Sequence, residues 1–218
     1  MSSGSAPPKV RSTQSWQRIA RRIRVPLGFI TAALYLVECA RRQPHYGAIA
    51  WSLALVLPGL ALRAAASGTV KKNRELTVSG PYAYTRNPLY LGSALIAAGF
   101  ALALASWVVA LAIAVGFAVI YIPVIAGEEQ FLRTTFPGFD GYCRRVPRFL
   151  PRLAPAKFNN NNDIQPHSSP VTSDAPDGFS LMLYRQHREY NSALGAALLY
   201  LSLLLLRPVL EHLLHRMQ

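Results

Sequence analysis

The sequence predicts an all-α, polytopic integral membrane protein with about five transmembrane helices and a polar loop region at its cytoplasmic end. Of its 218 residues, 51% are hydrophobic, and the mean hydropathy is +0.21. The apolar residues gather in runs close to the ~20 residues that a helix needs to cross a bilayer. The formal net charge is +13, and the basic residues flank these runs, as they do in membrane proteins.

Residues 1–24 are expected to form a basic N-terminal tail. Residues 1–15 are small and polar, which is typical of disorder. Trp16, Ile19 and Ile23 fall on one face of a possible helix among several arginines, and this pattern predicts a helix lying on an anionic membrane surface. A transit peptide is also rich in arginine and poor in acids, so it stays an alternative. No cleavable signal peptide is predicted.

Residues 25–155 are the predicted core, with four spans and a cytoplasmic segment. The four apolar segments are Val25–Ala40, Tyr46–Ala66, Leu89–Ala105 and Trp107–Ala126. The third and fourth are separated only by Ser106, so we expect them to form an antiparallel hairpin.

Residues 156–178 are a predicted disordered linker, rich in Asn, Ser, Pro and Asp. Residues 179–218 then combine a short amphipathic stretch, Phe179–Tyr190, with a fifth apolar segment, Ala193–Leu206, which ends at Arg207-Pro208. We expect this added helix to pack beside the core.

The positions of the basic residues predict the topology. With a cytoplasmic N-terminus, 19 of the 23 Lys and Arg residues lie on the cytoplasmic side, and only Arg41, Arg42, Arg207 and Arg216 lie on the other. The N-terminus is therefore predicted inside and the C-terminus outside. Because the charges flank apolar segments and form no stripe of their own, membrane lipids and not nucleic acid are the expected partner. The two cysteines have no CxxC spacing, so neither a disulfide framework nor a zinc site is expected.

The stretch Thr77–Gly92 concentrates turn-forming and polar residues at the mouth of the third apolar segment. Gly80-Pro81 predict a turn. Asn87 is a favoured N-cap and Pro88 a favoured first helical residue, so a helix is expected to begin there. The N-terminus of a helix attracts negative charge, and this end of the chain therefore suits an anionic ligand.

Two adjacent carboxylates, Glu128 and Glu129, follow the fourth apolar segment. An acid pair at a membrane boundary is costly unless it has partners. One reading pairs these acids with Arg86 or Arg133; the other has one of them bind a ligand held by the Thr77–Gly92 stretch.

Two motifs together resemble the isoprenylcysteine carboxyl methyltransferases, membrane enzymes related to the phospholipid methyltransferases. They are SGPYAYTRNPLYLG at residues 79–92 and GEEQFLRTTFPGFDGYCRRVPRFLP at residues 127–151. The resemblance covers roughly residues 68–153. It implies that S-adenosylmethionine (SAM) binds in the cytoplasmic loop region and that its methyl group passes to a lipophilic or prenylated acceptor from the bilayer. The acceptor group is a carboxylate of a prenylated-cysteine kind, or a lipid amine or hydroxyl.

The resemblance also implies roles for individual residues. The implied cofactor-binding residues are Leu76, Thr77, Tyr82, Asn87, Pro88, Leu89, Tyr90 and Glu128. Arg86 would orient an acceptor carboxylate or phosphate, and Glu129 is the nearest candidate for a general base toward an amine or hydroxyl. No metal site is implied. The alternatives are that Asn87 only caps its helix and that the tyrosines only anchor the chain at the interface.

The chain departs from the family pattern at two places. It has Asn87 where the eukaryotic enzymes usually have His, which removes a titratable group but keeps hydrogen bonding. It also has no basic residue in Ile120–Gly127, where those enzymes place an arginine for the acceptor carboxylate.

Two other classes of function stay open. One is an NADPH-dependent membrane reductase of the sterol-reductase type, whose cofactor half has a similar turn. The other is a non-catalytic membrane protein that keeps the fold. The sequence does not predict an oligomeric state.

Overall fold

The computed structural model describes residues 29–42, 45–70, 76–158 and 178–216, and all regular structure in these ranges is helical. The predicted all-α class is therefore confirmed for this part of the chain. The interfacial helix expected in the N-terminal tail, and all but the ends of the predicted linker, lie outside the described residues.

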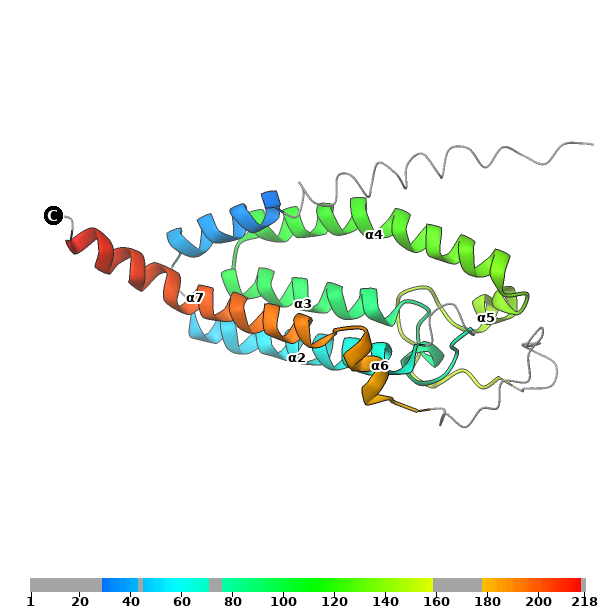
Figure 1. Cartoon of the computed structure of the whole chain (residues 1–218). Helices are drawn as coiled ribbons and strands as arrows, with labels where there is room; N and C mark the ends of the chain where they lie inside the picture. The colour runs from blue at the N-terminus through cyan, green and yellow to red at the C-terminus, as the bar shows by residue number, and fades with distance from the viewer. Residues whose placement is uncertain (1–28, 43–44, 71–75, 159–177, 217–218) are drawn as a thin grey trace, which may run out of the picture.

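Five helices run along one axis, each opposite in direction to the one before it (Figure 1). They are a helix over residues 29–41, α2 (Tyr46–Thr69), α3 (Pro88–Leu104), α4 (Trp107–Thr135) and α7 (Tyr190–Arg216). Three short helices lie toward the end of the bundle where α2 and α4 end and α3 begins. They are the 3₁₀ helix η1 (Gly80–Ala83), α5 (Phe139–Arg145) and α6 (Leu181–Gln186).

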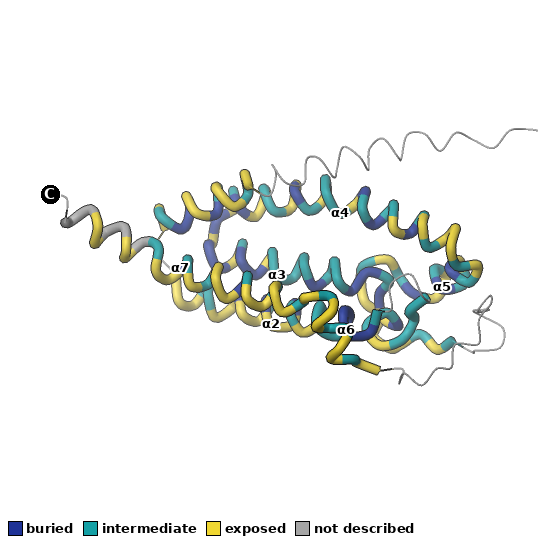
Figure 2. The backbone as a smooth tube through the Cα atoms, viewed as in Figure 1, coloured by how far each residue is buried: buried dark blue, intermediate teal, exposed yellow. Residues whose placement is uncertain are grey.

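The long helices have the length and surface of membrane-embedded helices. By length and composition α2 and α4 can cross a membrane, while α3 and the segment Tyr190–Leu206 are shorter apolar helices. Only 17% of the most apolar window of α2 or α4 is buried inside the protein, in contrast to the core helix of a soluble domain. Exposed positions recur along all the long helices (Figure 2). Large apolar side chains are among the exposed residues, including Leu57, Leu111, Val115, Ile122, Leu198 and Leu201. These features support insertion in a membrane; five spans stay a prediction.

The predicted hairpin of the third and fourth segments is present. The helix α3 ends at Ala105, which has the left-handed φ of 47°. Ser106 then caps α4, because its hydroxyl accepts a hydrogen bond from the amide of Val109. The same hydroxyl donates to Glu38 on the first helix at 2.8 Å. The turn between the two helices is thus fixed from both sides.

Glycines allow α2 and α3 to pack at backbone contact. A Cβ atom added to Gly92 would lie 2.7 Å from the carbonyl oxygen of Gly59, and one added to Gly99 would lie 2.9 Å from the carbonyl of Ser52. Both distances are shorter than real Cβ contacts allow. Gly92 and Gly99 therefore allow the two helices to pack closely.

The C-terminal helix is longer than the apolar segment that predicted it. The segment was expected to end at Arg207-Pro208, but α7 begins at Tyr190 and continues through Pro208 to Arg216. Proline removes one backbone donor inside a helix, and the leucine-rich residues on both sides are strong helix formers that continue through it.

The residues from 178 onward are built into the bundle. The backbone amide of Ser180 donates to the carbonyl of Gly68 at 2.8 Å, and Nδ1 of His187 lies 3.0 Å from the carbonyl oxygen of Ser67. Ala196 and Leu203 of α7 are buried in the main apolar cluster of the bundle. As expected, the added helix packs beside the core.

Candidate active site

The site begins with the turn that leads into α3. Gly80 has a φ of +57°, a left-handed conformation that glycine adopts without strain, and it begins the 3₁₀ helix η1. The backbone carbonyl of Tyr82, inside η1, accepts a hydrogen bond from the hydroxyl of Tyr142 on α5 at 2.8 Å. The predicted turn is present, and α5 holds it against the end of the bundle.

A strap of residues 147–156 follows α5 and binds the turn through backbone groups. The carbonyl of Pro147 accepts from the amide of Arg86 at 3.0 Å. The amide of Arg152 donates to the carbonyl of Tyr84 at 3.0 Å, and that of Ala156 to the carbonyl of Ala83 at 2.9 Å. Two segments more than sixty residues apart in the chain therefore share one set of hydrogen bonds.

Side chains of the turn complete this attachment. The buried hydroxyl of Thr85 donates to the carbonyl of Phe149 at 3.0 Å. The side-chain amide of Asn87 donates to the carbonyl of Arg148 at 2.9 Å. Asn87 does occupy the N-cap position of α3, but its side chain makes no capping hydrogen bond. The capping role considered for the Asn87 side chain is therefore wrong: its oxygen accepts no hydrogen bond from α3, and its Nδ2 donates to the strap.

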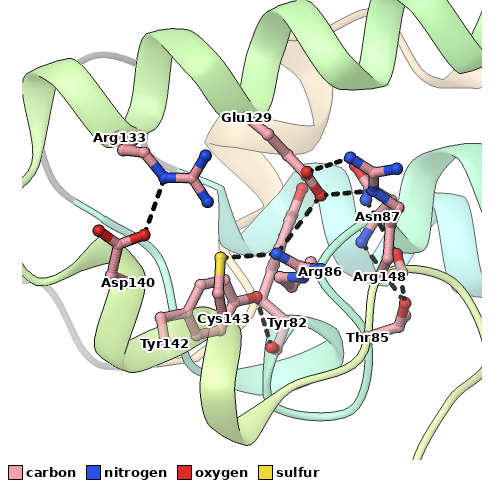
Figure 3. Close-up of polar contacts among 10 residues, drawn as sticks. All are labelled: Tyr82, Thr85, Arg86, Asn87, Glu129, Arg133, Asp140, Tyr142, Cys143 and Arg148. Carbon is pink, nitrogen blue, oxygen red and sulfur yellow. Dashed lines mark hydrogen bonds and ion pairs between the residues drawn. The ribbon is translucent and has the colours of Figure 1, made fainter.

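Glu129 is at the centre of a charged cluster (Figure 3). Its side chain is only 9% exposed, and it accepts hydrogen bonds from Nε of Arg148 at 3.0 Å and from Nη2 of the same guanidinium at 2.5 Å. Nη1 of Arg86 lies 3.5 Å from its Oε1. The predicted pairing of an acid with Arg86 is confirmed, while the closest partner, Arg148, was not foreseen.

The guanidinium of Arg86 is buried between two elements. Its Nη1 donates to Sγ of Cys143 on α5 at 2.6 Å. Its Nε is also buried, and among the described residues this atom has no hydrogen-bond partner. The cluster thus contains two guanidinium groups and one carboxylate.

Arg133 pairs with Asp140, and not with Glu128 or Glu129. Its Nε donates to Asp140 at the start of α5 at 2.8 Å, with both side chains more than half exposed (Figure 3). Arg133, which was considered as a partner of Glu128 and Glu129, instead fixes α5 to the end of α4.

Glu128 faces a different direction from its neighbour. It is exposed, and its carboxylate accepts a hydrogen bond from the hydroxyl of Tyr90 at 2.7 Å. The ring of Tyr90 packs edge-on against Tyr121, which stacks on Phe117. The hydrogen bond thus joins two predicted cofactor-binding residues, Tyr90 of α3 and Glu128 of α4.

The other predicted residues surround the same turn. Leu76 packs against the small apolar cluster of α5, and Thr77 is half-buried beside it in the chain. Pro88 is fully buried as the first residue of α3. The carbonyl of Leu89 accepts from Ser93 at 2.9 Å and from Arg63 at 3.4 Å.

Burial keeps two tyrosines of the site in the neutral form. It raises the pKa of Tyr82 and of Tyr142 well above the ordinary value of a phenol. Both hydroxyls are therefore protonated at neutral pH, and that of Tyr142 donates to the carbonyl of Tyr82.

An apolar cavity of about 680 Å³ lies between α3 and α4 and reaches the charged cluster. Alanines form much of its wall on both helices, together with Ile122, Ile125 and Phe117. Arg148 and Phe149 of the strap also line it, and Arg148 is the one charged residue among its lining residues. Its volume is in the range of small-molecule pockets.

Sequence reasoning missed the role of the strap. The guanidinium of Arg148 forms an ion pair with Glu129, and the guanidinium of Arg145 donates to the carbonyl of Lys157 at 3.1 Å. One signal in the sequence could have indicated this role. Acids at a membrane boundary need a basic partner, and Ile120–Gly127 contains no basic residue, so an arginine from another segment was required.

Within the described residues, no group of three or more His, Cys, Asp or Glu side chains could hold a metal ion. The site consists of the start of α3, the charged cluster around Glu129, the Tyr90–Glu128 pair and the apolar cavity between α3 and α4.

Comparison with known proteins gives partial matches. Residues 51–138 match the phospholipid methyltransferase family. This range contains η1, α3, α4 and both glutamates of the site, but neither α5 nor the strap. The resemblance to the membrane methyltransferases is confirmed for these residues.

Curated relatives match over a similar length. The cobalt-zinc-cadmium resistance protein CzcN of Cupriavidus metallidurans is 42% identical over 84 residues, which are 38% of this chain and 39% of the relative. The nickel-cobalt-cadmium resistance protein NccN of Alcaligenes xylosoxydans xylosoxydans is 39% identical over 84 residues, with the same coverage. The match thus spans about two fifths of each relative. No solved structure matches the chain significantly.

Proposed function

We propose that this protein is a SAM-dependent methyltransferase that acts at the cytoplasmic face of a membrane on a lipophilic acceptor. The observation that carries the proposal is the phospholipid methyltransferase match over residues 51–138. That range supplies Arg86, Glu129 and the helical walls of the apolar cavity, and Arg148 of the strap joins the cavity to the charged cluster.

The cofactor side is the start of α3 with the turn before it. Asn87, Pro88, Leu89 and Tyr90 hold the methionine end, where the helix dipole favours a carboxylate. Glu128, held by Tyr90, is an exposed carboxylate that suits the cofactor's amino group or a ribose hydroxyl. Tyr82 lines the adenosine side, and Leu76 and Thr77 offer backbone groups.

The charges of the cluster favour an acidic acceptor. Arg86 and Arg148 together carry two positive charges against the one negative charge of Glu129. The buried Nε of Arg86 adds a donor that has no partner among the described residues. An acceptor carboxylate or phosphate would balance this charge, while a lipid amine would increase it.

In this proposal Glu129 does not act as a general base. A carboxylate held by one guanidinium and 3.5 Å from another is stabilised in its ionised form and is a poor proton acceptor. Its role in this proposal is to position Arg86 and Arg148. An acidic acceptor needs no base, because its ionised oxygen is already a nucleophile.

The methyl group of SAM is already activated by its sulfonium, so the chemistry required of the protein is positioning. Bound SAM would supply this methyl group to an ionised acceptor oxygen, with S-adenosylhomocysteine as the leaving group. The protein contributes by aligning donor and acceptor and by excluding water with the apolar walls between α3 and α4.

The proposal includes a topology. The positive-inside distribution of the basic residues favours a cytoplasmic N-terminus and an external C-terminus, with the site at the cytoplasmic end. In Figure 1 the turn before α3 and the end of α4 lie at the same end of the bundle, which agrees with that assignment.

Incubation of the purified protein with radiolabelled SAM and membrane lipids tests the function. We expect label to enter the organic extract as an alkali-labile ester, since the charge of the cluster favours an acidic acceptor. Arg148→Gln should abolish most of this transfer. An alkali-stable labelled lipid amine would overturn the acceptor assignment, and no SAM binding would overturn the enzyme class.

A further inference from the structure

A second cavity, of about 700 Å³, lies on the side of the bundle formed by α7 and the first helix. Its walls come from the helix over residues 29–41, α2, α3, α4 and α7. It shares Ala97, Ile113 and Phe117 with the cavity between α3 and α4, so these three residues separate the two spaces. Its α7 wall lies outside residues 51–138, which match the methyltransferase family.

The cavity exists because facing helices carry small residues. Ala112 and Gly116 of α4 and Gly195 and Ala196 of α7 all line it. A Cβ atom added to Gly195 would meet no heavy atom within 4 Å. The space beside α7 is therefore wide enough for a ligand chain, and its volume is within the range of small-molecule pockets.

The polar groups that line the cavity gather where α2, α3 and α7 meet, and they are already satisfied. The guanidinium of Arg63 donates to both carboxylate oxygens of Glu189, at 2.9 to 3.1 Å. The hydroxyl of Ser192 donates to Glu189 at 3.1 Å, and that of Ser93 donates to the carbonyl of Leu89 at 2.9 Å. The charge of Arg63 is thus balanced within the protein.

The remaining polar lining residues are engaged as well. The hydroxyl of Tyr35 donates to the carbonyl of Leu199 at 2.9 Å, and Thr31 has an interaction of its own. Tyr121 packs its ring between Tyr90 and Phe117. This second cavity therefore presents no excess charge, in contrast to the first, whose one charged lining residue, Arg148, belongs to the charged cluster.

We propose that this second cavity is a binding site for one hydrocarbon chain of an uncharged membrane lipid, separate from the acceptor site. The apolar walls would hold the chain through the hydrophobic effect. A neutral hydroxyl or ester head matches Arg63, whose charge Glu189 already balances, whereas an anionic head would gain no unpaired cation from this lining residue. The site does not depend on the proposed methyl transfer.

Photolabelling of the full-length protein in lipid nanodiscs tests this site. Two probes would carry the same photoreactive alkyl chain, one ending in a hydroxyl and the other in a carboxylate, and peptide mass spectrometry would locate the label. We expect the alcohol to label the α7 segment 192–199 and the acid to label it far less. Equal labelling by the two probes would overturn the choice of a neutral lipid.

Substitutions distinguish the cavity from the outer surface of α7. Gly195→Phe fills the space, and Ala112→Phe fills it from α4. The matched control is Leu198→Phe, at a position that is 56% exposed. Both filling substitutions should remove most of the α7 label, and the control should retain it. Label that persists in a folded filling variant would show ordinary contact with bilayer lipid and would refute the site.

The probe comparison uses the unaltered protein, so it remains decisive if a filling variant does not fold. SAM binding, measured on the same samples, tests the proposed function separately. Selective alcohol labelling without SAM binding would uphold this site and reject the methyltransferase.

Discussion

The buried carboxylate of Glu129 depends on an arginine that follows it by nineteen residues in the chain. We expect Arg148→Gln to lower the free energy of unfolding by about 1–2 kcal/mol, since it leaves Glu129 with Arg86 alone. The value is below that of a fully buried pair because the Arg148 side chain is 50% exposed. Thermal unfolding in detergent measures the change.

A double-mutant cycle is the control for this pair. If the two side chains act together, Glu129→Gln combined with Arg148→Gln will cost less than the sum of the single substitutions. Strictly additive costs would mean that the two groups are not coupled in the folded protein.

Asn87 allows a test of what its side chain does. Asp and Asn are equally good helix caps, so Asn87→Asp should be harmless if the side chain capped α3. Because the amide donates to the carbonyl of Arg148, a carboxylate would instead face that carbonyl. We expect Asn87→Asp to destabilise the protein by at least about 1 kcal/mol.

Thermal unfolding of Asn87→Asp and Asn87→Ser, measured side by side, provides the comparison. Serine is also a good cap but lacks the reach of the amide, so both variants should be less stable than the original protein. Unchanged stability in both would refute the contact with the strap.

At the scale of helices and loops, close packing of α2 on α3 makes Gly92 hard to replace. A Cβ atom there would lie 2.7 Å from the Gly59 carbonyl, so we expect Gly92→Ala to destabilise the protein by about 1–3 kcal/mol. Gly195→Ala is the matched control, because its added Cβ meets nothing within 4 Å. That variant should gain up to about 1 kcal/mol from helix propensity. Equal effects of the two substitutions would contradict the packing.

Local signals in the sequence predicted the helices well. Asn87-Pro88 indicated the start of α3, and Ser106 between two apolar runs indicated the hairpin. These predictions succeed because caps, prolines and apolar runs act over a few residues. The strap could not be predicted in this way, since its hydrogen bonds to Ala83, Tyr84 and Arg86 join distant segments through backbone groups.

The same dependence on contacts between distant segments explains why the site was predicted only in part. The motif around Arg86 and Asn87 indicated the right end of the bundle, and Glu128 does contact Tyr90 there. The motif did not indicate that Arg148 would supply the guanidinium absent from Ile120–Gly127. A side chain that crosses from one loop to a helix leaves no periodic pattern in the sequence.

At the scale of the whole molecule, the topology makes a prediction about accessibility. Lys157 and His212 are both exposed, the first beyond the strap and the second near the end of α7. In a background where Cys39 and Cys143 are replaced by serine, we expect Lys157→Cys to react with an impermeant thiol reagent only in opened cells. We expect His212→Cys to react in intact cells. The reverse pattern would contradict the inside location of the N-terminus.

The C-terminal residues are part of the bundle, so their removal should affect more than one property. Ala196 and Leu203 are buried in the main cluster, and Glu189 neutralises Arg63. We expect truncation after Pro155 to reduce stability and to change acceptor use more than SAM affinity. The reason is that α7 lines the second cavity, which shares the wall residues Ala97, Ile113 and Phe117 with the proposed acceptor cavity. Unchanged acceptor use in the truncated protein would count against this arrangement.

Titration of the purified protein with SAM and, separately, with NADPH by isothermal calorimetry in detergent tests whether this protein is a methyltransferase. We expect saturable binding of SAM that is weakened by Glu128→Gln, and no binding of NADPH. Saturable binding of NADPH without SAM would contradict the methyltransferase and favour a membrane reductase. Binding of neither would favour a non-catalytic protein with this fold.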